Sequence, residues 1–153
     1  NEKPLAYVQR IARAKADKVA ALHPQAVVLA ADTTVFCGRK ILGKAETPDE
    51  ARAFLTLLSG RRHRVSTAVS IVSAARPAGH HFTVTSIVKF KHLSPAEIDA
   101  YLRTNDWVGK AGAYGIQGPA AAFVSFMSGS YTTIVGLPVY ETIKALKAQG
   151  ITP

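Results

Sequence analysis

One stretch of this chain, residues 26–44, reads AVVLAADTTVFCGRKILGK, and the expected fold depends on it. Its first part, residues 26–31, is short, apolar and rich in β-branched side chains, which is typical of a strand buried on both faces. Asp32 follows where that strand is expected to emerge, and ligands of open α/β sheets bind beyond the carboxyl ends of strands. With a lysine returning at Lys44, this carboxylate can hold a metal or activate water beside a phosphate. An aspartate also commonly begins a turn, so its position alone favours neither reading.

Composition predicts one globular domain over residues 1–153. Hydrophobic residues make up 48% of the chain and charged residues 19%, a balance typical of a folded protein. No apolar run is long enough to cross a bilayer, and the start shows no signal-peptide pattern, so we expect a cytoplasmic protein without a membrane segment. The single cysteine, Cys37, excludes an internal disulfide and is expected to be a small buried hydrophobe.

The charge balance favours an anionic partner. The chain carries 19 Lys and Arg against 10 Asp and Glu, a net charge of +9 at pH 7, which suits nucleotides, nucleic acid or an acidic surface. The basic knot RRHR at residues 61–64 follows a Ser-Gly pair, and we expect it to be a solvated turn. The sequence has no basic arm or RNA-binding aromatic motif, and its histidines lack metal-site spacing, so nucleic acid is not the favoured partner.

Residues 4–23 have the periodicity of an amphipathic helix. Val8, Ala12, Lys15, Val19 and Leu22 recur at intervals of three and four residues, which places them on one helix face. Lys15 therefore lies on the apolar stripe, where a lysine must either extend to solvent or meet an anion. Extension is the commoner outcome, so the pattern leaves both fates open.

Two capping motifs mark the starts of helices. TPDE at residues 47–50 and SPAE at residues 94–97 place proline at the first helical position and glutamate at the third. We expect these helices to reach about Leu58 and Arg103. Between them, residues 64–74 and 82–92 alternate apolar and polar side chains, and RPAG at residues 76–79 predicts the turn of an antiparallel hairpin.

A glycine-rich segment follows, GKAGAYGIQG at residues 109–118, with glycine at every third position. Such spacing lets the backbone approach a ligand closely or adopt positive φ, but it matches neither the P-loop nor the dinucleotide-binding fingerprint. A plain tight loop is an equal alternative, and Trp107 and Tyr114 are expected to be packing residues. Two more strands are expected over residues 121–127 and 131–135, before a closing helix over residues 139–147.

Several short motifs together resemble the Maf-type nucleoside triphosphate pyrophosphatases. Each would be weak alone, but they occur in the family's order over nearly the whole chain. They are YVQRIARAKA (7–16), ADT (31–33), ILGK (41–44), LSG (58–60), KAGAYGIQG (110–118), GSY (129–131) and VGLP (135–138).

The resemblance implies a fold, an activity and a set of site residues. The fold would be α/β, a mixed twisted sheet flanked by helices in two lobes with a central cleft, similar to the inosine-triphosphate pyrophosphatases. The activity would be cleavage of nucleoside triphosphates to monophosphate and pyrophosphate by a cytoplasmic homodimer that depends on a divalent metal, Mg²⁺ or Mn²⁺. Asp32 matches the family's general base, which also lies at the metal. Lys15 and Lys44 match its phosphate-facing lysines, and Thr33 and Gln117 match positions tied to base selection, here for dTTP and UTP.

The sequence departs from the family pattern in three places. Ala45 follows Lys44 where the family usually has proline, and Gly109 replaces a common acid. The family also opens with a strand and an arginine-bearing phosphate loop that are not seen here, so we expect the natural protein to be longer. Two other functions therefore stay open: a catalytically silent nucleotide-binding regulator of cell division, and a basic nucleic-acid-binding module.

Overall fold

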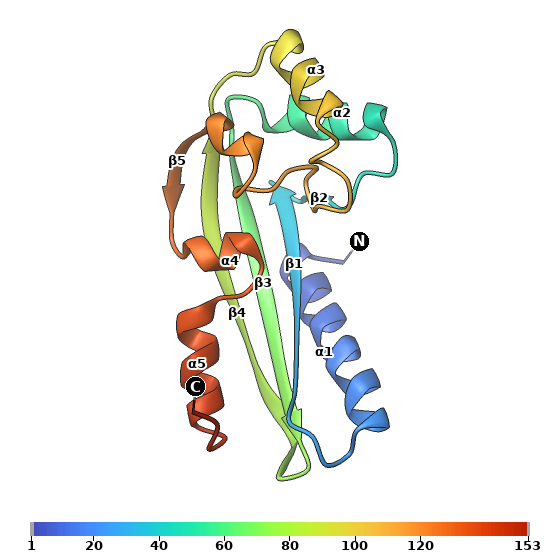
Figure 1. Cartoon of the computed structure of the whole chain (residues 1–153), viewed down its shortest axis with the longest axis vertical. Coiled ribbons are helices and arrows are strands. Elements are labelled where there is room, and N and C mark those ends of the chain that lie inside the picture. The colour runs from blue at the N-terminus through green and yellow to red at the C-terminus, as the bar shows by residue number, and fades with distance from the viewer. Residues whose placement is uncertain (1, 153) are drawn as a thin grey trace.

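A computed structural model describes residues 2–152, in which helices surround one long sheet (Figure 1). The helices are α1 (Pro4–Leu22), α2 (Pro48–Leu58), α3 (Pro95–Arg103), α4 (Tyr131–Val135) and α5 (Val139–Lys147), with a 3₁₀ turn, η1, at Pro119–Phe123. The strands are β1 (Val28–Cys37), β2 (Lys40–Leu42), β3 (Arg62–Ser73), β4 (Arg76–Phe90) and β5 (Val124–Ser128). The expected α/β class is confirmed.

The sheet has the strand order β2-β1-β3-β4-β5, and every pairing between these strands is antiparallel. Helix α1 packs on β1 and β3, while α4 and α5 lie on the opposite face of the sheet (Figure 1). Helices α2 and α3 gather at one end of the sheet together with the glycine-rich segment. Their apolar side chains form the largest core cluster there, around Leu55, Leu58, Phe90 and Tyr101.

Both capped helices have the predicted bounds. The Thr47 hydroxyl accepts a hydrogen bond from the backbone N–H of Glu50, and Ser94 forms a full capping box with Glu97. In α2 the Glu50 carboxylate bonds instead to the backbone N–H of Glu46. Each cap satisfies backbone donors that a helix start leaves free, which explains why these two bounds are readable from sequence.

Strand β1 continues through Asp32, so the prediction that the strand emerges there is wrong. Residues 28–36 of β1 pair with β3 without a break, and Asp32 lies opposite Ala68. The residues after Asp32 are β-branched or aromatic and pair well on a pleated surface, which carries the strand onward. The strand is not buried on both faces either, because Leu29 is 36% exposed.

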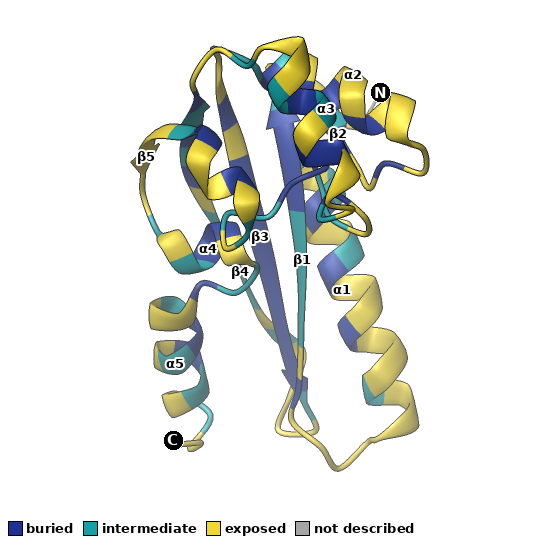
Figure 2. Cartoon of the chain, turned by 45° about the horizontal axis from the view of Figure 1, so that its top comes forward, coloured by how far each residue is buried: buried dark blue, intermediate teal, exposed yellow. Residues whose placement is uncertain are grey.

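Helix α1 buries a different stripe from the one predicted. Val8, Ala12 and Ala16 are buried against the sheet, whereas Val19 and Leu22 are exposed (Figure 2). Spacing of four residues keeps the small side chains on one line, so the helix can approach β1 and β3 closely. Lys15 therefore sits beside the buried line, next to Ala16.

The hairpin of β3 and β4 is confirmed, but its turn is not at residues 76–79. The turn lies at residues 74–75, and Arg76 already pairs with Ser73. The register shifts between Ile71 and Ser73, across from Gly79, which has a φ of +74°. Gly79 therefore lies at a bulge within β4. The sequence RPAG predicts a turn because proline and glycine are common in turns, but here they belong to a strand.

The segment at residues 131–135 is a helix, α4, and not the strand expected from its β-branched residues. Ser130 caps it, because its hydroxyl accepts from the backbone N–H of Thr133. The strand expected over residues 121–127 is also shorter, since η1 occupies its first part and β5 begins at Val124. The closing helix α5 is confirmed at residues 139–147. No helix within residues 2–152 has the length and apolar character needed to cross a membrane.

Candidate active site

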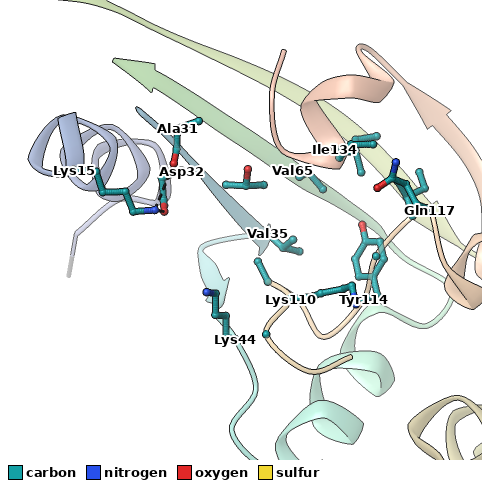
Figure 3. Close-up of a pocket in the computed structure, with 16 residues that line it drawn as sticks. Lys15, Ala31, Asp32, Val35, Lys44, Val65, Lys110, Tyr114, Gln117 and Ile134 are labelled. Carbon is teal, nitrogen blue, oxygen red and sulfur yellow. Dashed lines mark hydrogen bonds and ion pairs between the residues drawn. The ribbon is translucent and has the colours of Figure 1, made fainter. Parts of the chain in front are cut away.

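One cavity of about 340 Å³ lies where α1, β1, α4 and the glycine-rich segment meet (Figure 3). It brings together all five side chains that the sequence singled out: Lys15, Asp32, Thr33, Lys44 and Gln117. They come from a helix, a strand, the segment after β2 and a loop, so their convergence is a property of the fold and not of local sequence.

The two ends of the cavity differ in chemistry. Figure 3 shows Lys15 and Asp32 at one end and Gln117, Ile134 and Tyr114 at the other, with Val35 between them. The first end holds the Lys15–Asp32 ion pair, whereas the second combines apolar walls with the neutral amide of Gln117 and with Lys110, whose charge is paired with Asp106. An elongated ligand with an anionic end and a flat, neutral end matches this division.

Lys15 meets an anion, which is one of the two fates that the sequence left open. Its Nζ lies 2.6 Å from Asp32 Oδ1 and 3.4 Å from the carbonyl oxygen of Ala31. The Asp32 side chain is only 17% exposed, while that of Lys15 is 52% exposed. The Asp32 carboxylate inside the cavity is therefore hydrogen-bonded to the Lys15 ammonium group at the cavity mouth.

The glycine-rich segment is hydrogen-bonded to the end of β2 and to the residues that follow it. Gly112 donates its backbone N–H to the carbonyl oxygens of Leu42 and Gly43, and Lys44 pairs with Ala111 in an isolated antiparallel bridge. Gly112 has a φ of +70°, and a Cβ there would lie 2.9 Å from Val35. Both the positive φ and the close approach to Val35 require glycine at this position, which fits a tight loop and a ligand-binding loop equally.

Comparison with known proteins identifies a family for this chain. The family described as Maf-like protein matches residues 1–149. The chain belongs to the Maf family. It is 58% identical over 149 residues to the dTTP/UTP pyrophosphatase of Roseobacter denitrificans, covering 97% of this chain and 78% of that protein. It is 50% identical over 143 residues to the nucleoside triphosphate pyrophosphatase of Anaplasma marginale (92% and 71% covered), and 48% identical over 149 residues to the dTTP/UTP pyrophosphatase of Zymomonas mobilis (97% and 73%).

In this Maf chain a third lysine, Lys110 of the glycine-rich segment, also lines the cavity, and no local pattern in the sequence singles it out. Lys110 Nζ donates to the backbone carbonyl of Asp106 and lies 3.2 Å from Asp106 Oδ1. Its stem passes close to Gly115, where a Cβ would lie 2.9 Å from Lys110 Cδ and Cε. A Cβ at Gly118 would lie 2.5 Å from Asp106 Oδ2. A side chain at Gly115 or Gly118 would therefore displace Lys110 or Asp106 from its present position.

The basic knot at residues 61–64 is not a solvated turn, because it begins β3 and His63 is buried. His63 Nε2 lies 2.7 Å from the hydroxyl of Tyr114, and both rings meet Phe90 edge-on. Burial lowers the pKa of His63 to about 4 and raises the pKa of Tyr114, so both are neutral at pH 7. Tyr114 is a packing residue, as predicted. Its hydrogen bond with His63 also holds the glycine-rich segment against β3.

A chain of hydroxyl groups runs from the cavity into the core of the Maf fold. Thr33 Oγ1 lies 2.8 Å from Thr67 Oγ1, and Thr67 Oγ1 donates to the carbonyl oxygen of Thr133 at 2.7 Å. Thr67 is fully buried, whereas Thr33 is only partly buried and lines the cavity. These hydrogen bonds tie β1, β3 and α4 together beside the cavity.

The donor set of this Maf cavity fits a metal ion in one specific way. Within residues 2–152 no three His, Cys, Asp or Glu side chains gather as a metal cage, and Asp32 is the only carboxylate among the described lining residues. Mg²⁺ is usually held by one or two carboxylates together with water and substrate phosphates. The cavity therefore suits a cation that is bound jointly by Asp32 and a polyphosphate, and it does not suit a permanent structural metal.

Proposed function

We propose that this Maf chain is a nucleoside triphosphate pyrophosphatase that hydrolyses dTTP and UTP in preference to other nucleotides. The observation that carries the proposal is one cavity with Lys15, Asp32 and Lys44 at its charged part and Gln117 beside apolar walls at its other end. A nucleotide has the same two-part character, a polyanion joined to a flat neutral base. The printed names of the relatives, dTTP/UTP pyrophosphatase and nucleoside triphosphate pyrophosphatase, support this assignment.

In the proposed reaction, water attacks the α-phosphorus, and the bond from that phosphorus to the bridging oxygen breaks. The oxygen of water stays on the monophosphate, and pyrophosphate leaves. Asp32 is the proposed general base, because its carboxylate is held inside the cavity by β1 and can accept the proton of water. Lys15 and Lys44 would bind phosphate oxygens and offset the charge that develops on the leaving group.

A divalent cation would be held by Asp32 together with the phosphates of the substrate. When bound, it would supply charge neutralisation and orient the reacting groups. Lys15, which contacts Asp32 Oδ1 at 2.6 Å, would then turn its ammonium group towards the phosphates, since its side chain is half exposed at the mouth of the cavity.

Gln117 is the proposed reader of the base. A neutral amide both donates and accepts hydrogen bonds, which suits the edge of thymine or uracil. The family branch that acts on 7-methyl-GTP tends to carry glutamate at this position, and a glutamate offers only acceptors. By resemblance we also propose that the chain acts as one domain and as a homodimer in the cytoplasm.

A panel of nucleotides tests the proposed function. Purified chain with Mg²⁺ is expected to release pyrophosphate from dTTP and UTP faster than from 7-methyl-GTP. Gln117→Glu should shift the ratio of kcat/KM towards 7-methyl-GTP, by about tenfold for one exchanged hydrogen bond. No release from any nucleotide would favour the silent regulator, whereas salt-dependent binding to duplexes without release would favour the nucleic-acid module. A clear preference of the unmodified chain for 7-methyl-GTP would show that Gln117 is misassigned.

A further inference from the structure

We infer that Thr67 is a specificity-positioning residue: it fixes the hydroxyl of Thr33 as a pure hydrogen-bond acceptor towards the cavity, which selects bases that carry a donor on their ring nitrogen. This inference rests on the proposed function and goes beyond it. It assigns part of the choice between bases to a buried residue that does not line the cavity.

The direction of each hydrogen bond follows from counting protons. A backbone carbonyl oxygen can only accept a hydrogen bond, so Thr67 donates its single hydroxyl proton to the carbonyl oxygen of Thr133, at 2.7 Å. Thr67 then has only lone pairs to offer Thr33, whose Oγ1 lies 2.8 Å away, so Thr33 must be the donor in that bond. The one proton of Thr33 is thereby committed to the protein interior, and what remains for a ligand is its lone pairs.

We call the two successive hydrogen bonds, from Thr33 to Thr67 and from Thr67 to the carbonyl of Thr133, the threonine relay. The fold holds this relay in place. Thr33 and Thr67 are directly opposite each other in the pairing of β1 with β3, and Thr67 is fully buried. Thr133 belongs to α4, which also supplies Ile134 to the cavity wall. A Cβ at Gly136 would lie 3.7 Å from Thr33 Oγ1, so the glycine leaves room beside this hydroxyl, which lines the cavity. Thr33 thus offers an acceptor to the cavity on the side where α4 lies.

Pyrimidine bases differ in whether ring nitrogen N3 can donate a hydrogen bond to this acceptor. Thymine and uracil carry a hydrogen on ring nitrogen N3, which can donate to Thr33. Cytosine has a lone pair on N3, which would face the lone pairs of Thr33 and leave both unpaired at a cost in binding. The relay therefore favours UTP over CTP, two nucleotides of almost the same shape.

The experiment compares kcat/KM for UTP and CTP in wild-type protein and in Thr67→Val. Valine has nearly the same shape as threonine but cannot accept the Thr33 proton, so Thr33 becomes free to donate to N3 of cytosine. We expect the UTP:CTP ratio to fall about tenfold, with most of the change in a higher value for CTP. Thr67→Ser keeps the relay and should restore the wild-type ratio. Ser66→Ala removes a buried hydroxyl that bonds to Thr85 on the other face of β3, and it should leave the ratio unchanged.

A purely structural role for Thr67 would lower stability without raising activity on CTP. A folded Thr67→Val protein with the wild-type ratio would overturn the inference, as would a wild-type protein that hydrolyses UTP and CTP equally. If Thr67→Val does not fold, Thr33→Val decides, because it removes the acceptor at a partly exposed position. In that variant the UTP:CTP ratio should fall through lower activity on UTP, and an unchanged ratio would again contradict the inference. A wild-type protein that hydrolyses no nucleotide would overturn the proposed function and this inference with it, an outcome distinct from activity without UTP preference.

Discussion

Asp32→Asn is expected to lower kcat for dTTP hydrolysis by about 10²- to 10⁴-fold, the usual contribution of a general base. The amide has nearly the shape of the carboxylate, but it cannot take the proton from water. Asp32 lies in the middle of β1, where its backbone pairs with Ala68 of β3, and the substitution leaves that pairing intact. The measurement is steady-state release of pyrophosphate, with the thermal midpoint of unfolding recorded in parallel.

A matched control removes a carboxylate of equal size away from the cavity. Asp99 forms an ion pair with Arg52 on the surface, where the Asp99 side chain is 43% exposed. Asp99→Asn should keep full turnover, because a surface ion pair contributes little and touches no reacting group. Wild-type turnover in a folded Asp32→Asn protein would exclude Asp32 as the base.

Replacement of either phosphate-facing lysine is the second large effect that we expect. Lys15→Ala and Lys44→Ala should each lower kcat/KM by about 10- to 150-fold, since a hydrogen bond to a charged group contributes roughly 1.5–3 kcal/mol. Lys44 forms no ion pair with an acid among the described residues, so its loss should appear mainly in KM. Lys15 also contacts Asp32, so its loss should lower kcat as well.

Lys18 provides the control for bulk charge. It lies about one turn further along α1, is exposed, and does not line the cavity. Lys18→Ala removes the same charge from the same helix, and it should change kcat/KM less than twofold. Equal losses at Lys15 and Lys18 would show that net positive charge attracts the nucleotide and that Lys15 has no specific contact.

The parts of the fold that could be predicted from sequence are those with local causes. The capped starts of α2 and α3 depend on residues within four positions of each other, and their bounds are correct. The sequence predicts a strand where α4 lies, because the β-branched residues of this segment favour strands locally, and that prediction is wrong. The helical form of α4 depends on the Ser130 cap and on a bond from Thr67, a residue 66 positions away in the chain.

The candidate site shows the same division. Asp32 and Lys15 could be selected because an acid after an apolar run and a lysine beside an apolar stripe are locally unusual. Lys110 and His63 could not, since a lysine in a loop and a histidine among arginines both have the appearance of solvated residues. Only the sheet and the glycine-rich loop bring His63 to Tyr114, 51 positions further along the chain. Pairing across such separations is not encoded in any local pattern.

Hydrolysis of dTTP in ¹⁸O-labelled water tests most directly whether this cavity directs water to the α-phosphorus. The purified chain is incubated with dTTP and Mg²⁺, and mass spectrometry locates the label in the products. Attack at the α-phosphorus predicts one labelled oxygen in dTMP and none in pyrophosphate. Label in pyrophosphate, or labelled inorganic phosphate released with dTDP, would contradict the proposed reaction.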